Sequence, residues 1–120
     1  MGHTYAKVRV YNKSDSSMYM DFELIVDTGS TYTWVDGREL QRLMVEPMGR
    51  WKFRTIEGRL VERDIGEAVI ECMDEKATRI VVFAEEGDVK VLGVDALEGL
   101  RLEVNPVTRE LRKVEALLAV

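Results

Sequence analysis

The chain has 120 residues, 46% of them hydrophobic and 32% charged, a composition typical of one globular domain rather than a disordered chain. Its 17 Lys and Arg against 22 Asp and Glu give a formal net charge of −5, which argues against a nucleic-acid partner. No apolar run approaches the roughly 20 residues that span a bilayer, and residues 1–13 lack the apolar stretch of a secretory signal. We therefore expect a single domain over residues 1–120, in the cytoplasm and with no membrane partner.

Histidine and cysteine occur once each, as His3 and Cys72. A lone cysteine cannot form a disulfide within the chain and fits a reducing compartment. The two residues also provide no cluster for a zinc site and no convincing Ser-His pair for nucleophilic catalysis. We therefore expect no metal and no cofactor, and any hydrolytic chemistry would have to come from carboxylates.

The first part of the chain predicts a hairpin of two strands. Residues 5–11 and 18–26 alternate apolar and polar side chains with the period of two that a half-buried strand shows. Residues 12–17 between them are polar and rich in Ser and Asp, which indicates a hairpin loop. The second strand ends directly at Asp27.

The sequence Asp27-Thr28-Gly29-Ser30 follows this strand and is the candidate site. A carboxylate at the end of an apolar strand lies partly in the core, where its ionised form requires hydrogen-bond donors. A tight turn at Gly29 and the hydroxyls of Thr28 and Ser30 would provide those donors. Asp, Gly and Ser are also common in ordinary turns, so the tetrapeptide alone is equally consistent with a turn that has no catalytic role.

The next residues predict two short elements. Residues 31–35 are rich in β-formers, which predicts a short strand. Residues 37–44 carry a short apolar stripe after Asp36 and Glu39, whose spacing is that of a capping box. We expect a short helix here that has no function beyond packing.

A second hairpin follows in the middle of the chain. Residues 51–55 and 59–71 predict two strands joined at Ile56-Glu57-Gly58, where the glycine allows the positive φ of a hairpin tip. Gly66 lies inside the long returning strand and indicates a β-bulge there.

Two further strands are predicted after this hairpin. Residues 78–84 are strongly apolar, which predicts a strand near the centre of the sheet, and residues 89–92 predict another strand that ends at Gly93.

The end of the chain predicts a second short helix and a closing hairpin. Asp95 and Glu98 again have capping-box spacing, which predicts a helix over residues 95–100. Residues 100–104 and 110–116 flank a turn and predict two paired strands. The predicted elements together describe an all-β domain with one or two short helices, closed or nearly so.

Three features stand in a fixed order in the chain. They are the strand ending in Asp27-Thr28-Gly29-Ser30, the Gly-tipped hairpin, and Val91-Leu92-Gly93 running into Val94-Asp95-Ala96-Leu97. This ordered set resembles the retropepsin-like aspartic proteases, the single-domain class with retroviral and prokaryotic members. Residues 92–100 are especially similar to the prokaryotic branch. The resemblance extends over about residues 5–114 and implies a closed acid-protease barrel.

The resemblance implies an aspartic endopeptidase that hydrolyses peptide bonds with a water activated by two aspartates. The chain contains one Asp-Thr-Gly sequence, so the second aspartate would be Asp27 of another copy, and we expect an obligate homodimer. Asp27 would be catalytic and Thr28 would hydrogen-bond across the dimer axis. Gly29 and Ser30 would donate hydrogen bonds to the carboxylate.

The resemblance assigns further roles outside the turn. The hairpin tip, Thr55-Ile56-Glu57-Gly58, would close as a flap over an extended peptide or unfolded protein substrate. Val91-Leu92-Gly93 would thread beside the catalytic turn, with Asp95 in the helix that follows. The closing hairpin over residues 100–116 would build the main dimer sheet. The tip has one glycine where the retroviral enzymes have several, and Ser30 stands where they usually have Ala.

Two other functions fit the same sequence. The first is a dimeric peptide-binding module of the same fold without catalysis, which a glycine-poor flap would favour. The second is a structural or regulatory β-barrel in which Asp27 only organises a turn. Trp34, Trp51 and Phe53 would line substrate subsites or, as is more common for aromatic residues, fill the core or an interface.

Overall fold

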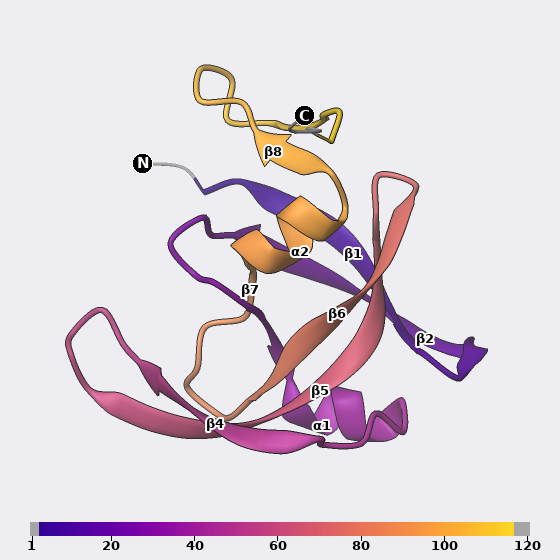
Figure 1. Cartoon of the computed structure of the whole chain (residues 1–120), viewed down its shortest axis with the longest axis vertical. Helices are drawn as coiled ribbons and strands as arrows, with labels where there is room; N and C mark the ends of the chain where they lie inside the picture. Colours follow the sequence, from indigo (N-terminus) through magenta and orange to yellow (C-terminus); the bar gives the residue numbers. More distant parts are fainter. Residues whose placement is uncertain (1–2, 117–120) are drawn as a thin grey trace, which may run out of the picture.

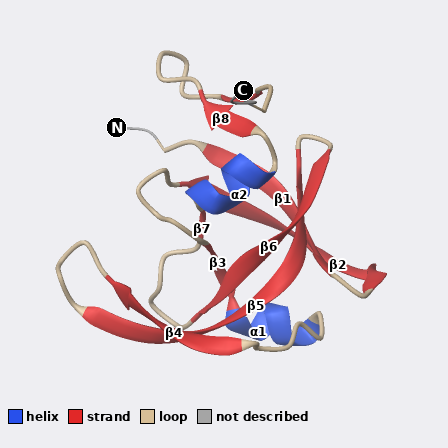
Figure 2. Ribbon diagram, viewed as in Figure 1, coloured by secondary structure: helices blue, strands red, loops and turns tan. Residues whose placement is uncertain are grey.

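The computed structural model describes residues 3–116, which form nine β-strands and two short α-helices (Figure 1, Figure 2). The prediction of a mostly β protein with short helices is therefore confirmed. Neither helix of the described range has the length and apolar character needed to cross a membrane. The strands are β1 (Tyr5–Asn12), β2 (Asp15–Val26), β3 (Thr33–Asp36), β4 (Gly49–Arg54), β5 (Leu60–Cys72), β6 (Glu75–Ala84), β7 (Val91–Leu92), β8 (Leu102–Val104) and β9 (Leu111–Lys113), and the helices are α1 (Gly37–Arg42) and α2 (Val94–Gly99).

Seven of the strands form one sheet in the order β1-β2-β7-β3-β6-β5-β4. β1 also pairs with β5, with Val10 opposite Ile70, so that six strands close into a ring of pairings and β4 stays outside it. Closing the ring leaves β4 as the strand of this sheet with a free edge, and such edges can pair with other chains. The β4–β5 hairpin projects at one end of the molecule, and β8 and β9 form a separate two-stranded sheet at the other end (Figure 1).

One apolar core fills the space between the strands and the helices. α1 contributes Leu40 to this core, and α2 contributes Ala96 and Leu97. Both helices pack against β6, whose last four residues are all buried. Consecutive buried residues mean that both faces of the strand are covered, which confirms the predicted central position of this strand.

The first hairpin is longer than predicted. β2 begins at Asp15 rather than at Met18, and only Lys13 and Ser14 separate it from β1. Residues 15–17 are exposed and show no alternation of apolar and polar side chains. The sequence pattern therefore does not reveal that they belong to the strand.

The predicted β-bulge at Gly66 is wrong. β5 pairs with β6 in continuous register through this residue, with Ile65 opposite Val82 and Gly66 opposite Val81. A Cβ atom at Gly66 would lie 2.8 Å from the carbonyl oxygen of Glu46. Glycine is therefore required by the close approach of the segment before β4, not by an irregularity of the strand.

α1 forms where it was predicted but ends earlier, at Arg42. The Asp36 carboxylate accepts a hydrogen bond from the Arg38 N–H at 2.9 Å, as an N-cap does. Glu39 pairs with Arg42 at 2.9 Å, so it does not complete the predicted capping box. The helix stops because Met44, two residues after its last turn, has a left-handed φ of 60°.

β7 is shorter than predicted, because it comprises two residues rather than residues 89–92. It lies between β2 and β3. Val91 and Leu92 run parallel to the last two residues of β2, and Val91 lies opposite Trp34 of β3 in the antiparallel sense. Since β2 and β3 are consecutive in the chain, a distant strand enters between the two strands that the candidate turn connects.

Gly93 follows β7 at a point where backbone segments lie very close together. A Cβ atom at this position would lie 2.3 Å from the carbonyl oxygen of Tyr32 and 2.9 Å from that of Ser30. Backbone atoms held in a sheet cannot move aside as the end of a long side chain can. The entry of β7 between its neighbours therefore depends on glycine here.

Substitution of Gly93→Ala should destabilise the protein by about 3 kcal/mol or more, because the methyl group overlaps two backbone carbonyls. Gly49→Ala is the matched control, since its Cβ would lie 3.7 Å from the nearest atom, Cδ1 of Ile65, and should change stability by less than about 1 kcal/mol. Urea unfolding followed by circular dichroism measures both. Equal stability of the two variants would contradict the close approach at Gly93.

Candidate functional site

The candidate site is the turn that follows β2, and its centre is the half-buried Asp27. The backbone N–H of Gly29 donates a hydrogen bond to Oδ1 of Asp27 at 2.9 Å, and the hydroxyl of Ser30 donates to Oδ2 at 3.2 Å. Each carboxylate oxygen therefore has a donor from the turn itself. Hydrogen bonds to both oxygens fix the orientation of the carboxylate.

Strand β7 holds the first residue of the turn. The backbone N–H of Asp27 donates to the carbonyl oxygen of Leu92 at 3.0 Å, and the N–H of Ser30 closes the turn on the carbonyl of Asp27 at 3.1 Å. Gly29 fits beside the carboxylate, since a Cβ atom there would lie 3.1 Å from Oδ1. The predicted position of Val91-Leu92-Gly93 beside the turn agrees with this geometry.

Helix α2 holds the far side of the turn. The N–H groups of Val94 and Asp95 donate to the carbonyls of Ser30 and Thr31, both at 2.8 Å. These are the first N–H groups of the helix, which have no partner inside it. The predicted capping role of Asp95 is therefore wrong: Gly93 is the N-cap, its missing side chain makes no capping bond, and the turn's carbonyls take that function.

Asp95 instead points to β6, where its Oδ1 lies 3.5 Å from Nη1 of Arg79. The side chain of Arg79 packs over Gly99, since a Cβ atom there would lie 1.9 Å from its Nε. Asp95 is thus an ion-pairing residue of α2 within the chain.

Thr33 supports the candidate site, and the sequence analysis missed it. It is the buried polar residue of the core, with no exposed surface, and its hydroxyl oxygen accepts a hydrogen bond from the Gly93 N–H at 3.1 Å. Its position in a short run of β-formers does not distinguish it from Thr31, which is exposed. Only the pairing of β3 with β7 shows that it binds the residue after β7.

Thr4, close to the start of the described chain, contacts the residue before the turn. Thr28 is exposed. The residue before the turn, Val26, donates its N–H to the carbonyl of Thr4 at 2.7 Å, and the Thr4 hydroxyl donates to the carbonyl of Arg109 at 2.5 Å. The start of the chain therefore links the end of β2 to the turn between β8 and β9.

The tip of the β4–β5 hairpin is closed by its own hydrogen bonds. The N–H of Thr55 donates to the carbonyl of Arg59 at 2.8 Å, and the N–H of Gly58 donates to the carbonyl of Thr55 at 2.9 Å. Gly58 has a φ of 87°, which confirms the predicted left-handed tip, and Ile56 and Glu57 are exposed. The structure brings Val91, Leu92, Gly93 and Asp95 to the Asp27 turn, whereas the tip residues project away from the ring (Figure 1).

Aromatic side chains join the base of this hairpin to the segment after the Asp27 turn. The ring centroids of Tyr32 and Trp51 lie 5.3 Å apart, and those of Trp34 and Phe53 lie 5.0 Å apart. Such distances are typical of packed aromatic pairs. Tyr32, which the sequence analysis did not select, completes this group of four.

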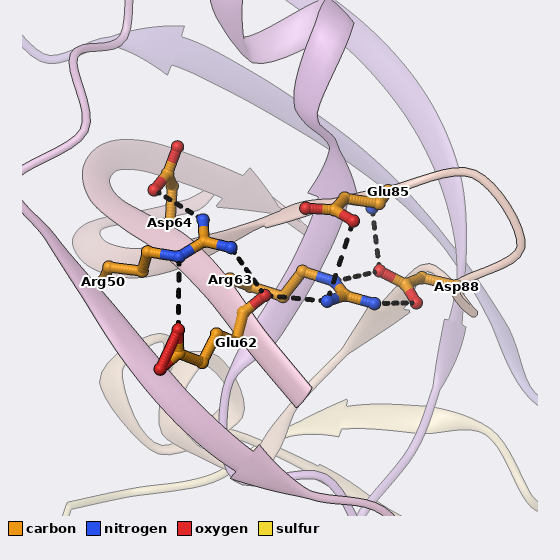
Figure 3. Close-up of polar contacts among 6 residues, drawn as sticks. All are labelled: Arg50, Glu62, Arg63, Asp64, Glu85 and Asp88. Carbon is orange, nitrogen blue, oxygen red and sulfur yellow. Dashed lines mark hydrogen bonds and ion pairs between the residues drawn. The ribbon is translucent and has the colours of Figure 1, made fainter. Parts of the chain in front are cut away.

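Two groups of ion pairs surround the hairpin (Figure 3). Arg63 of β5 donates from Nε and Nη2 to the two carboxylate oxygens of Asp88 in the β6–β7 loop, at 2.7 Å and 2.9 Å, and Glu85 lies 3.7 Å from its Nη1. In contrast, Arg50 of β4 pairs with Asp64 and Glu62 of its own hairpin, at 3.1 Å and 3.6 Å.

The Arg63–Asp88 pair is the better shielded of the two groups. The side chains of Arg63 and Asp88 are 14% and 18% exposed, whereas those of the Arg50 group are 42–51% exposed. The hydrogen bonds from Arg63 hold the pKa of Asp88 below its ordinary value of 3.8, and Asp88 in turn raises the pKa of Arg63. The N–H of Glu85 also donates to Asp88, at 2.8 Å.

No family model matches the chain, and no curated protein is significantly similar to it. Among residues 3–116 no three His, Cys, Asp or Glu side chains gather as ligands of a metal ion would. Two surface hollows, one beside Cys72 and one beside Lys90, do not include Asp27 in their walls. The chemistry of the candidate site therefore has to be argued from the turn itself.

Thr33→Val should destabilise the protein by about 1–3 kcal/mol, because the N–H of Gly93 loses its acceptor while it stays buried. Thr31→Val is the control: Thr31 is exposed, and its backbone carbonyl still accepts from α2 after the substitution. Chemical unfolding of both variants measures the difference. A Thr33→Val protein as stable as the control would show that this hydrogen bond has no role in holding β7.

The ion pair of Asp88 predicts how stability depends on pH. A carboxylate whose pKa is lower in the folded state contributes stability above its unfolded pKa, and the contribution disappears as the pH falls through the folded pKa. The free energy of unfolding of the wild type should exceed that of Asp88→Asn by about 1 kcal/mol near neutral pH, and the difference should shrink below about pH 4. Urea titrations at a series of pH values test this. A difference that stays constant down to about pH 2 would contradict it.

Proposed function

We propose that the chain is an aspartic endopeptidase of the retropepsin-like type, active as a homodimer with one site per dimer. The observation that carries the proposal is the half-buried Asp27 carboxylate at a strand end, with a donor on each oxygen and a turn fixed by β7 and α2. The fold also supports the proposal. The resemblance implies a closed barrel and a short helix after Val91-Leu92-Gly93, and the structure has a ring of six strands with α2 after β7.

A second copy of the chain is required because the chemistry needs two carboxylates. Two carboxylates close together share one proton, since both cannot ionise at that distance. The chain has one Asp-Thr-Gly sequence, so the second carboxylate is Asp27 of the other copy, related by a two-fold axis. The exposed Thr28 lies beside Asp27 and is available to the other copy in such a pair.

The reaction follows from this shared proton. A water between the two Asp27 carboxylates gives a proton to the ionised one while its oxygen attacks the carbonyl carbon of the substrate. The protonated carboxyl gives its proton to the carbonyl oxygen, and a tetrahedral diol forms. The C–N bond then breaks as the nitrogen accepts a proton from one carboxyl while a hydroxyl of the diol returns its proton to the other carboxylate, which gives the acid and the amine and restores the shared proton. Gly29 and Ser30 keep the carboxylate oriented throughout, which preserves the geometry between the two halves.

The substrate is an extended peptide or an unfolded protein segment. Residues 55–58 at the hairpin tip would pair with such a peptide along its backbone and close over it as a flap. The tip has a single glycine and is closed by hydrogen bonds between Thr55 and Arg59. This observation favours the second candidate function, a dimeric peptide-binding module of the same fold that holds peptides without cutting them.

The dimer interface is expected to include the β8–β9 hairpin and the start of the chain. The Thr4 hydroxyl binds the carbonyl of Arg109 in this hairpin, so these two segments form one surface next to the Asp27 turn. Tyr5 and Val107 on this side are 55% and 87% exposed. Burial of these apolar side chains would favour association of two copies.

Asp27→Asn is expected to abolish peptide cleavage while leaving the fold intact, because Asn has the shape of Asp but cannot share or transfer the proton. An unbiased peptide mixture incubated with wild type and variant from about pH 3 to about pH 7, and analysed by mass spectrometry, tests this. Ser30→Ala is the companion variant: it removes one donor from the carboxylate and should lower kcat about tenfold without abolishing it.

The outcomes separate the candidate functions. Cleavage by the wild type alone supports the peptidase. Binding of the same peptides by both proteins, without cleavage by either, supports the peptide-binding module. A wild type that is monomeric at micromolar concentration by sedimentation contradicts the peptidase, because a single chain holds half of the dyad.

A further inference from the structure

The β4–β5 hairpin has two chemically different faces. Alternate residues of a strand point to opposite faces, and residues directly opposite each other on paired strands share one face. Trp51 lies opposite Arg63 and Phe53 opposite Val61, so these four side chains share the face that meets the body of the protein. The other face carries Arg50 and Lys52 with the acidic residues opposite them, Asp64 and Glu62.

Arg63 is the charged residue on the face of the hairpin that meets the body of the protein, and its side chain reaches beyond the hairpin. Its guanidinium reaches Asp88 in the loop between β6 and β7, and Figure 3 shows it pointing toward Glu85 and Asp88. Arg50 forms similar ion pairs on the outer face, but both of its partners belong to the hairpin itself. Both arginines thus form ion pairs with carboxylates. Of the two, only Arg63 connects the hairpin to another part of the chain.

The geometry points to a latch: we propose that the Arg63–Asp88 pair holds the base of the hairpin against the β6–β7 loop and sets the point where the hairpin bends. Residues 54–60 beyond the latch are then the part that moves. Their role as a lid over Asp27 rests on the proposed function, whereas the latch itself does not. Arg63 and Asp88 are in this sense positioning residues.

Several properties of the pair suit it to this role. It is bidentate and well shielded from solvent, and such charge-assisted hydrogen bonds are stronger than those of exposed ion pairs. Asp88 is itself held by the N–H of Glu85, so the anchor in the loop is fixed before Arg63 binds it. The aromatic contacts of Trp51 and Phe53 lie on the same face and support the base of the hairpin alongside the pair.

The tip of the hairpin makes the proposal testable without any peptidase activity. Residues 56–59 read Ile-Glu-Gly-Arg, the recognition sequence of a known processing protease that cleaves after the arginine. A protease has to draw a segment of chain into an extended form, so cleavage in a folded hairpin proceeds through its opened state. When opening is fast, the rate of cleavage follows the population of that state.

Asp88→Asn should accelerate cleavage after Arg59 by about tenfold near neutral pH, since about 1.4 kcal/mol of closing free energy corresponds to a factor of ten. Arg63→Gln should have a similar effect, and the double variant should not be faster than either single variant, because all three break the same contact. Arg50→Gln is the matched control and should leave the rate within about twofold of the wild type. Synthetic peptides of residues 50–68, with and without Arg50→Gln or Arg63→Gln, correct for any direct effect of these two substitutions on recognition by the protease, and Asp88 lies outside the recognised segment.

Hydrogen exchange on the same proteins distinguishes a latch from a general loss of stability. Asp88→Asn should accelerate exchange over the whole sheet by the factor that its lower global stability produces, and a larger acceleration at residues 49–65 supports the latch. An acceleration at residues 49–65 no greater than that over β1, β2 and β6, or the same cleavage rate in Asp88→Asn and Arg50→Gln, overturns it.

A kinetic readout then connects the latch to the lid. In an active wild type, Asp88→Asn should raise KM by about three- to tenfold while changing kcat less than threefold, because the closed lid is populated less in the complex. An inactive wild type in which the cleavage and exchange results still hold would reject the proposed function and leave the latch in place.

Discussion

Backbone hydrogen bonds from β7 and from the start of α2 hold both ends of the Asp27 turn, and the rest of the candidate site depends on them. Leu92 accepts the N–H of Asp27, and α2 donates to the carbonyls of Ser30 and Thr31. Neither set involves a side chain of the turn. The position of the turn is therefore determined by the path of the chain about 65 residues later in the sequence, so the site forms only when the whole sheet has folded.

This arrangement explains several residues that otherwise have no common role. Gly93 permits the close approach of Tyr32, and Thr33 satisfies the buried N–H that Gly93 presents. α2 has no side-chain cap because the carbonyls of the turn take that function. All three features follow from the insertion of β7 between β2 and β3. Glycine avoids the steric overlap, Thr33 accepts the buried N–H, and the carbonyls of the turn accept the first N–H groups of the short helix.

The sequence predicts well what depends on local pattern and poorly what depends on non-local pairing. The strands with apolar alternation, the glycine at the hairpin tip and the two short helices lie close to their predicted positions. The exposed start of β2 lacks such a pattern, and β7 is only two residues long because its neighbours, not its own side chains, define it. Thr33 and Tyr32 acquire their roles from strands distant in the sequence. The prediction of a β-bulge at Gly66 was wrong for the same reason, since the segment that approaches this glycine comes from outside its own strand pair.

The segment from Glu85 to Asp95 connects the hairpin to the turn. Its first part holds Arg63 of the hairpin through Asp88, and its last part, three residues beyond, begins the contacts of Val91, Leu92 and Gly93 with β2, β3 and the Asp27 turn. In the proposed enzyme one continuous piece of backbone therefore contacts both the base of the hairpin and the Asp27 turn within each copy. Association of two copies then has to bring together only two halves that are each already ordered, which lowers the conformational entropy lost when the site is completed.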